Sequence, residues 1–240
     1  MLNICKREFG KNLNRGYDTA FMKLRKQGLI WLPWVGKNYK EYNGLLVVGE
    51  SNYADLELPG DTIDSAKQRV KNDENFTRKV VDCFGCCRRQ KNKTFTSLSK
   101  ILCGEHSDTI ADEEYLKVWQ AVSFMDLVQE PMRGLKTCCD AAEDPKSRER
   151  PEDKAVLSGW SVVKSVLSEL KPSRVLFVGL GMVDVLSRLP EEIHVNTNSN
   201  GFRIGTLLNQ VRFIAIPNPG GAFGFSPTKY AKLLKAESFV

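Results

Sequence analysis

The sequence predicts an α/β fold, a three-layer α/β/α sandwich in which helices cover both faces of a four-stranded parallel sheet. Four short runs rich in Val, Ile, Leu and Phe are typical of strands that are buried on both faces. Segments with helical spacing separate these runs, and such alternation favours parallel strands that are joined by helical crossovers.

The predicted strands are Leu45–Val48, Val122–Leu127, Arg174–Val178 and Val211–Ile216. Ligands of an open α/β sheet bind beyond the carboxyl ends of its strands. The segments after Val48 and Ile216 are therefore the first places to look for a functional site.

Apolar residues at helical spacing predict six helices, Tyr17–Gln27, Thr62–Lys71, Phe76–Cys86, Asp112–Gln120, Pro151–Leu170 and Pro227–Lys235. The charged stretch from residue 138 to residue 150 predicts a solvated loop. Because the sequence contains no repeat and no convincing boundary, we expect one domain over residues 1–240, with an N-terminal helical extension over about residues 1–40.

Composition restricts the class of protein. Of the 240 residues, 42% are hydrophobic and 27% are charged, as in ordinary globular proteins, and the formal charge of +6 suits a protein that meets a polyanion on one face. No apolar run is long enough to span a bilayer, and the first residues do not resemble a secretory signal. We therefore expect a monomeric, cytoplasmic protein whose seven cysteines are reduced.

Four short motifs carry a resemblance to a known family. They are Gly49-Glu50-Ser51-Asn52-Tyr53, Phe124-Met125-Asp126-Leu127-Val128-Gln129, Arg174-Val175-Leu176-Phe177-Val178-Gly179 and Asn218-Pro219-Gly220. In this order they resemble the motifs of the uracil-DNA glycosylase superfamily, which has Gly-Gln-Asp-Pro-Tyr or Gly-Glu-Ala-Pro-Gly first and His-Pro-Ser last. The resemblance covers Leu45 to about Tyr230. It implies a uracil-DNA glycosylase-like fold and an enzyme that flips a base out of DNA and cleaves its glycosidic bond.

Glu50 and Asn218 are the candidate catalytic residues. A carboxylate near the sugar can stabilise the developing cation and orient water, and Glu50 stands where some branches of the superfamily keep a Glu. The alternative for Glu50 is a helix cap. Asn218 replaces the usual His, and its amide can donate to an oxygen of the departing base. The alternative for Asn218 is a turn residue before Pro219.

Asp126 stands where the superfamily has the Asn that reads the flipped base. An ionised carboxylate only accepts hydrogen bonds, which suits the exocyclic amine of cytosine, whereas Asn can also donate to O4 of uracil. The alternative is a structural Asp that pairs with an Arg or a backbone N–H. Gly49, Ser51 and Tyr53 complete the base-binding set, Tyr53 by packing its ring on the base or, alternatively, in the core.

The resemblance also suggests residues that contact DNA. Phe223 and Phe225 would wedge into the duplex where the base leaves, or would pack in the core instead. Ser226, Lys229, Arg88 and Arg89 would lie near backbone phosphates, although charged runs are often only solvated surface.

Cys83, Cys86, Cys87 and Cys103 lie within a short stretch of the chain. Some glycosylases of the superfamily hold an iron–sulfur cluster, but two ligands of that cluster precede the first motif, where this chain has only Cys5. We therefore expect no metal and no cofactor.

Together these residues predict a monofunctional DNA glycosylase that leaves an abasic site. The motifs place no Lys as a Schiff-base nucleophile. Asp126 favours a cytosine-type substrate, and a modified cytosine in foreign DNA, such as phage DNA, would spare the host genome. The alternatives are a repair glycosylase for uracil or another damaged base, and an inactive nucleic-acid-binding module of the same fold.

Overall fold

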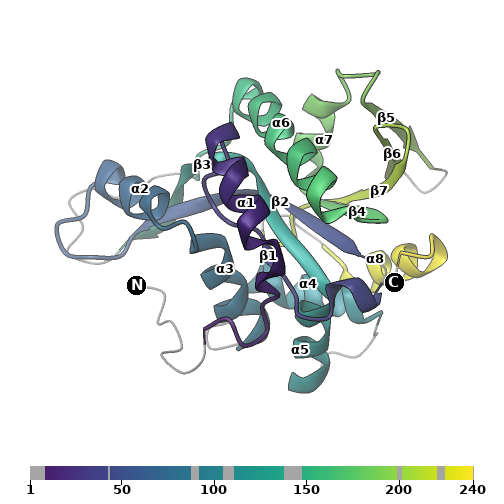
Figure 1. The fold of residues 1–240 in the computed structure, drawn as a ribbon, viewed down its shortest axis with the longest axis horizontal. Helices are drawn as coiled ribbons and strands as arrows, with labels where there is room; N and C mark the ends of the chain where they lie inside the picture. Colours follow the sequence, from purple (N-terminus) through teal and green to yellow (C-terminus); the bar gives the residue numbers. More distant parts are fainter. Residues whose placement is uncertain are drawn as a thin grey trace.

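The structure is a computed structural model that describes residues 9–42, 44–87, 92–104, 111–137, 148–198, 202–220 and 225–239. Within these ranges, a mixed sheet of seven strands is flanked by helices (Figure 1). None of the helices in the described ranges is both long enough and apolar enough to cross a membrane.

The strands of the sheet lie in the order β1-β3-β2-β4-β7-β6-β5. Their bounds are Trp34–Val35 (β1), Leu45–Leu56 (β2), Val122–Thr137 (β3), Arg174–Val178 (β4), Ile193–Thr197 (β5), Arg203–Leu207 (β6) and Val211–Ile216 (β7). The neighbours β3, β2, β4 and β7 pair in parallel, whereas β1, β6 and β5 pair antiparallel with their neighbours.

The prediction of a purely parallel, four-stranded sheet is therefore wrong, although each predicted strand lies within an observed one. The strands that were not predicted lie at the two edges. β1 has only two residues, and β5 and β6 are mostly half-buried or exposed, so none of them has the continuous apolar run that marks a buried strand.

The helices are α1 (Asp18–Leu24), α2 (Ile63–Asn72), α3 (Phe76–Val80), α4 (Lys93–Cys103), α5 (Asp112–Ala121), α6 (Asp153–Leu170), α7 (Leu180–Leu186) and α8 (Pro227–Ala236). A π-helical segment, Val81–Cys86, continues α3, and short 3-10 turns occupy Arg15–Tyr17, Arg25–Gln27 and Tyr39–Tyr42. Neither α4 nor α7 was predicted. The α4 helix begins at a side-chain cap, because Asn92 accepts hydrogen bonds from the backbone N–H groups of Thr94 and Phe95.

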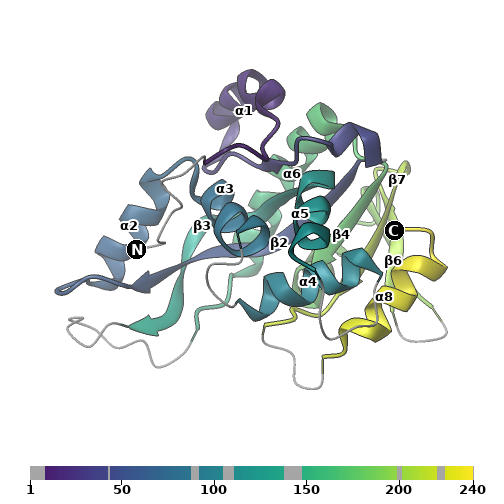
Figure 2. The same ribbon diagram turned by 90° about the horizontal axis from the view of Figure 1, so that it is seen from below.

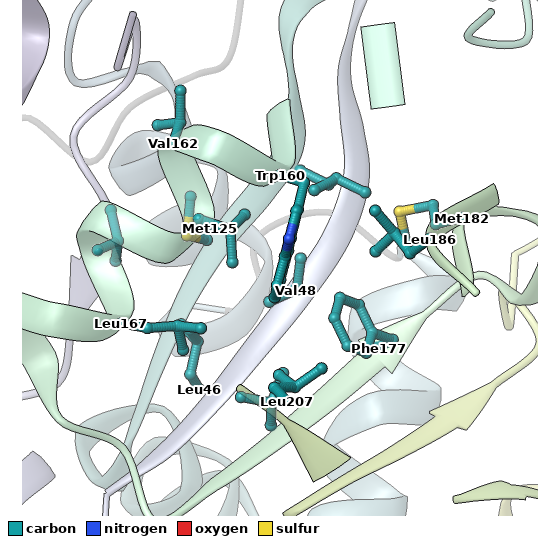
Figure 3. Close-up of a cluster of buried hydrophobic side chains, with 14 of the residues drawn as sticks. Leu46, Val48, Met125, Trp160, Val162, Leu167, Phe177, Met182, Leu186 and Leu207 are labelled. Atoms are coloured by element: carbon teal, nitrogen blue, oxygen red, sulfur yellow. The ribbon is translucent and has the colours of Figure 1, made fainter. Parts of the chain in front are cut away.

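Each face of the sheet has its own hydrophobic core. Alternate residues of β2 face opposite sides, so that Leu46 and Val48 pack under α1, α6 and α7, while Leu45 and Val47 pack against α4, α5 and α8. Figure 3 shows the first core, in which Trp160 of α6 lies beside Val48 and Phe177. Figure 2 shows α4, α5 and α8, which cover the other face of the sheet.

Residues 9–40 are part of this body and are only partly helical, whereas residues 1–8 of the expected helical extension lie outside the described residues. Phe21 and Leu24 of α1 belong to the same core as α6, and Trp34 in β1 pairs with Phe124 in β3. The buried side chain of Arg78 in α3 also fixes this segment, since it donates to the carbonyl of Pro33 and to the carboxylate of Asp18.

β2 and β3 continue well past the end of β4 and form a two-stranded ribbon (Figure 1). β4 pairs with β2 only as far as Val48, whereas β3 pairs with β2 as far as Leu56. The prediction that the first strand ends at Val48 is therefore wrong. This part of β2 contains polar residues and a glycine because it borders a cleft instead of a core, and such a sequence does not predict a strand.

Candidate active site

A cleft of about 560 Å³ lies where β4 ends and the ribbon of β2 and β3 continues. Its lining comes from the described parts of β2, β3 and α3, from the π-helical segment, from the first turns of α4, and from the segment after β7. Its volume is typical of pockets that hold a small molecule.

The cleft brings together the base-binding and catalytic residues that the sequence predicted. Gly49, Glu50, Ser51 and Tyr53 line it from β2, Asp126 lines it from β3, and Asn218 lines it from the segment after β7. Parallel strands bring these positions to one side of the sheet, although Glu50 and Asp126 lie within strands and not beyond their ends.

Asp126 is buried, with 5% of its surface exposed, and it lies opposite Gly49 in the pairing of β2 with β3. Its Oδ2 accepts a hydrogen bond of 3.1 Å from the Thr77 hydroxyl, so its partner is neither an Arg nor a backbone N–H. The pKa of Asp126 is raised to about 7, mainly by burial; the Thr77 hydrogen bond lowers it and the negative charge of Glu50 adds to the rise.

Gly49 makes room for this carboxyl group. A Cβ atom at position 49 would lie 2.9 Å from Asp126 Oδ1 and 2.9 Å from the ring of Phe124. Both distances are shorter than real Cβ contacts, so a side chain at position 49 would displace the group that we expect to read the base. Ser51 has a structural contact, because its hydroxyl donates to the carbonyl of Glu130 at 2.7 Å.

Glu50 is held by Tyr53. The Tyr53 hydroxyl donates to Glu50 Oε2 at 2.6 Å, and burial together with the charge of Glu50 raises the pKa of Tyr53. The helix-cap alternative for Glu50 is excluded, since β2 continues to Leu56 and the next helix begins at Ile63. The guanidinium of Arg148 lies 3.4 Å from the centre of the Tyr53 ring and covers one of its faces.

Asn218 stabilises a turn through the oxygen of its side-chain amide. Its Oδ1 accepts from the backbone N–H of Gly220 at 2.9 Å and from the Thr94 hydroxyl at 3.5 Å, so it does stabilise the turn. These bonds use only the carbonyl oxygen, and in the described part of the chain they leave the amide N–H₂ available to a ligand.

The predicted DNA-contacting residues are only partly described. Arg88, Arg89 and Phe223 lie outside the described residues. Phe225 stacks on Tyr230 with ring centres 4.8 Å apart and packs against the core, which is the alternative to a wedge. Ser226 caps α8 by accepting from the N–H of Lys229, and the Lys229 ammonium lies 4.9 Å from the ring of Phe202.

Several residues of the cleft were not predicted. Phe84, Phe95 and Phe124 form an aromatic wall, with successive ring centres 5.8 and 5.7 Å apart. Phe124 could have been found from its position two residues before Asp126, because such residues face the same side of a strand. Phe84 belongs to the π-helical segment, and no signal in the sequence distinguishes that segment from an ordinary helix.

The cysteines make separate contacts. Cys87 lies within hydrogen-bonding distance of the Asp82 carboxylate, and Cys103 within that of the Glu114 carbonyl. In the ranges that the structure describes, no three His, Cys, Asp or Glu side chains are grouped closely enough to hold a metal ion. The expectation that the protein carries no cofactor stays a prediction.

The raised pKa of Asp126 predicts that this residue makes stability depend on pH. The unfolded chain releases the proton near pH 3.9 and the folded protein near pH 7, so in this window the folded state binds more protons. Raising the pH therefore destabilises the wild type relative to Asp126→Asn, by about 2–3 kcal/mol between pH 5 and pH 8. Urea unfolding of both proteins measures this difference, and a difference that is the same at both pH values would contradict the prediction.

The cleft thus offers two carboxyl groups, an amide donor and an aromatic wall, and no Lys occurs among the described residues that line it. This set of groups can orient water beside one part of a ligand while it binds a planar ring at another. No family model matches the chain, and a search of curated proteins found no match either.

Proposed function

We propose that the protein is a monofunctional DNA glycosylase of the uracil-DNA glycosylase superfamily, which flips a base into the cleft and hydrolyses its N-glycosidic bond. The observation that carries the proposal is the common cleft of Glu50, Asp126 and Asn218. These residues come from three separate segments of the chain, and each has the chemistry that one part of the reaction needs.

In the proposed reaction, the bond between the base nitrogen and C1′ of the sugar breaks, and the base leaves with the bonding electrons. Glu50 faces the positive charge that develops on the sugar and accepts a proton from the water that adds to C1′. The Tyr53 hydroxyl fixes the position of the Glu50 carboxylate. The Asn218 amide donates to the negative charge on the departing base. The absence of Lys from the described lining supports hydrolysis without a Schiff base.

The cleft supports a pyrimidine that carries a substituent. Its volume of about 560 Å³ exceeds what a single pyrimidine ring fills, and its aromatic wall suits the faces of a base. Ionised Asp126 would accept from an exocyclic amine, which favours a cytosine-type base. A second candidate is uracil, because a pKa of about 7 leaves much of Asp126 protonated at neutral pH and able to donate to a carbonyl.

An abasic-site assay tests the proposal. The protein is incubated with matched duplexes that contain uracil, cytosine or a cytosine enlarged at C5, and the products are treated with alkali to cleave any abasic site. We expect cleavage only after the alkali treatment, and most of it with the enlarged cytosine. Cleavage without alkali would contradict a monofunctional mechanism. Binding of DNA without cleavage of any duplex would identify the inactive module instead.

A further inference from the structure

Three buried side chains form one chain of hydrogen bonds beside the cleft, and two of them, Asn52 and Asp126, line it. Asn52 Nδ2 donates to the hydroxyl oxygen of Thr77 at 2.7 Å, and the Thr77 hydroxyl donates to Asp126 Oδ2 at 3.1 Å. The exposed fractions are 5% for Asn52, 1% for Thr77 and 5% for Asp126. Because the three residues come from β2, α3 and β3, the chain ties both strands of the ribbon to the helix that covers them.

The direction of this chain is set by the chemistry of its members. An amide nitrogen only donates, so Thr77 must accept from Asn52, and the single hydrogen of its hydroxyl points to Asp126. As long as the Thr77 hydroxyl donates to it, Oδ2 of Asp126 is an acceptor, and a proton on the other oxygen preserves that hydrogen bond. Oδ1 lies beside Gly49 and has no hydrogen-bond partner in the described part of the structure, so a proton taken up by Asp126 belongs on Oδ1.

We propose that Thr77 is a specificity-determining positioning residue, which leaves Oδ1 of Asp126 as the single oxygen that reads the flipped base. Ionised, Oδ1 accepts from an exocyclic amine, as in cytosine. Protonated, it donates to a ring carbonyl, as in uracil. This inference rests on the proposed function and adds that the base preference changes with pH.

The surroundings place this change near neutral pH. Burial is the main cause that raises the pKa of Asp126, Thr77 of α3 lowers it, Glu50 of β2 raises it, and together they bring it to about 7. Among the described residues, Tyr53 of β2 also interacts with Asp126, and its own raised pKa keeps it neutral in this range. The relative rate on uracil should therefore rise as the pH falls through about 7.

Two substitutions of Thr77 separate its hydrogen bond from its bulk. Thr77→Val keeps the shape and removes the donor, whereas Thr77→Ser keeps the donor and removes a methyl group. The first measurement uses the protein without DNA and follows the carboxyl carbon of Asp126 by NMR over pH, with Asp126→Asn to assign the signal. We expect a higher pKa in Thr77→Val than in the wild type, and a value close to the wild type in Thr77→Ser.

The second measurement is the ratio of single-turnover rates on cytosine-type and uracil duplexes over the same pH range. In Thr77→Val the change of preference should move to higher pH, so that the ratio at pH 7 shifts toward uracil by roughly threefold to tenfold, the effect of one hydrogen bond. Thr77→Ser should restore the profile of the wild type. If Thr77→Val does not fold, Asn52→Ala frees the hydroxyl to turn away and should move the profile in the same direction.

The possible failures can be told apart. If the wild type forms no abasic sites on any duplex, the proposed function and base reading by Asp126 both fail, and the NMR titration still shows whether Thr77 controls the carboxyl group. If abasic sites form but Thr77→Val keeps the pH profile of the wild type, only the role of Thr77 is overturned. An unchanged pKa of Asp126 in Thr77→Val would overturn that role as well.

Discussion

Glu50→Gln should lower the single-turnover rate of base excision by at least ~10²-fold while DNA binding survives. The substitution keeps the size of the side chain and still offers an oxygen to the Tyr53 hydroxyl, which donates to Glu50 in the wild type. It removes the negative charge that faces the sugar cation and the site that accepts a proton from water. The loss should therefore appear in the rate constant at saturating enzyme and not in the affinity for DNA.

Two control variants define what this loss means. Glu130→Gln makes the same exchange at an exposed position of β3 and should retain the full rate. Tyr53→Phe keeps the ring but removes the hydroxyl that holds Glu50, and it should cost less than Glu50→Gln because the carboxylate remains. An excision rate for Glu50→Gln equal to that of the wild type would remove Glu50 from the mechanism.

Asp126→Asn should move the base preference from cytosine-type bases toward uracil. The Thr77 hydroxyl needs an acceptor, so it should bind the amide oxygen of the new side chain and turn the N–H₂ group toward the cleft. That N–H₂ group can donate to O4 of uracil. At the same position cytosine has an exocyclic amine, which is also a donor, so the two groups cannot form a hydrogen bond. Leaving buried polar groups unpaired costs about 1–3 kcal/mol, which corresponds to roughly a five- to hundredfold change in discrimination.

The measurement compares abasic-site formation by both proteins on matched cytosine-type and uracil duplexes. Because the variant resembles protonated Asp126, its preference should also be nearly independent of pH around neutrality, unlike that of the wild type. The groups around Tyr53 can still exclude one base by size, in which case the variant only loses the original activity. A variant with the preference and the rate of the parent would show that Asp126 does not read the base.

The sequence predicted the middle of the sheet from its apolar runs, and it predicted the polar residues Glu50, Asp126 and Asn218 of the cleft from their places in the motifs next to those runs. The run from Leu45 to Val48 is apolar without interruption, and Glu50, Asp126 and Asn218 lie in or directly after such runs. Thr77 and Asn52 could not be predicted as a pair. Their contact depends on how α3 packs over the ribbon, and neither residue differs in the sequence from an ordinary polar residue of a helix or strand.

The same limit explains the errors at the borders of elements. A strand that ends in the core and a strand that continues along a cleft begin with the same kinds of residues, and they differ only after the apolar run. After Val48, β2 borders the cleft instead of packing against apolar side chains. Its residues there are more polar, although its backbone stays extended. Polarity alone predicts a turn there, and pairing with β3 decides otherwise.

The early end of β4 gives β2 an open strand edge beside the cleft. Beyond Val48, β3 pairs with one side of β2, and no strand in the described ranges pairs with the other. Along such an edge, every second residue points both its N–H and its C=O away from the neighbouring strand. Residues of this edge line the cleft, and side-chain substitutions leave their main-chain groups in place. An alanine scan of the cleft would therefore leave unmeasured any part of the binding energy that comes from the main chain.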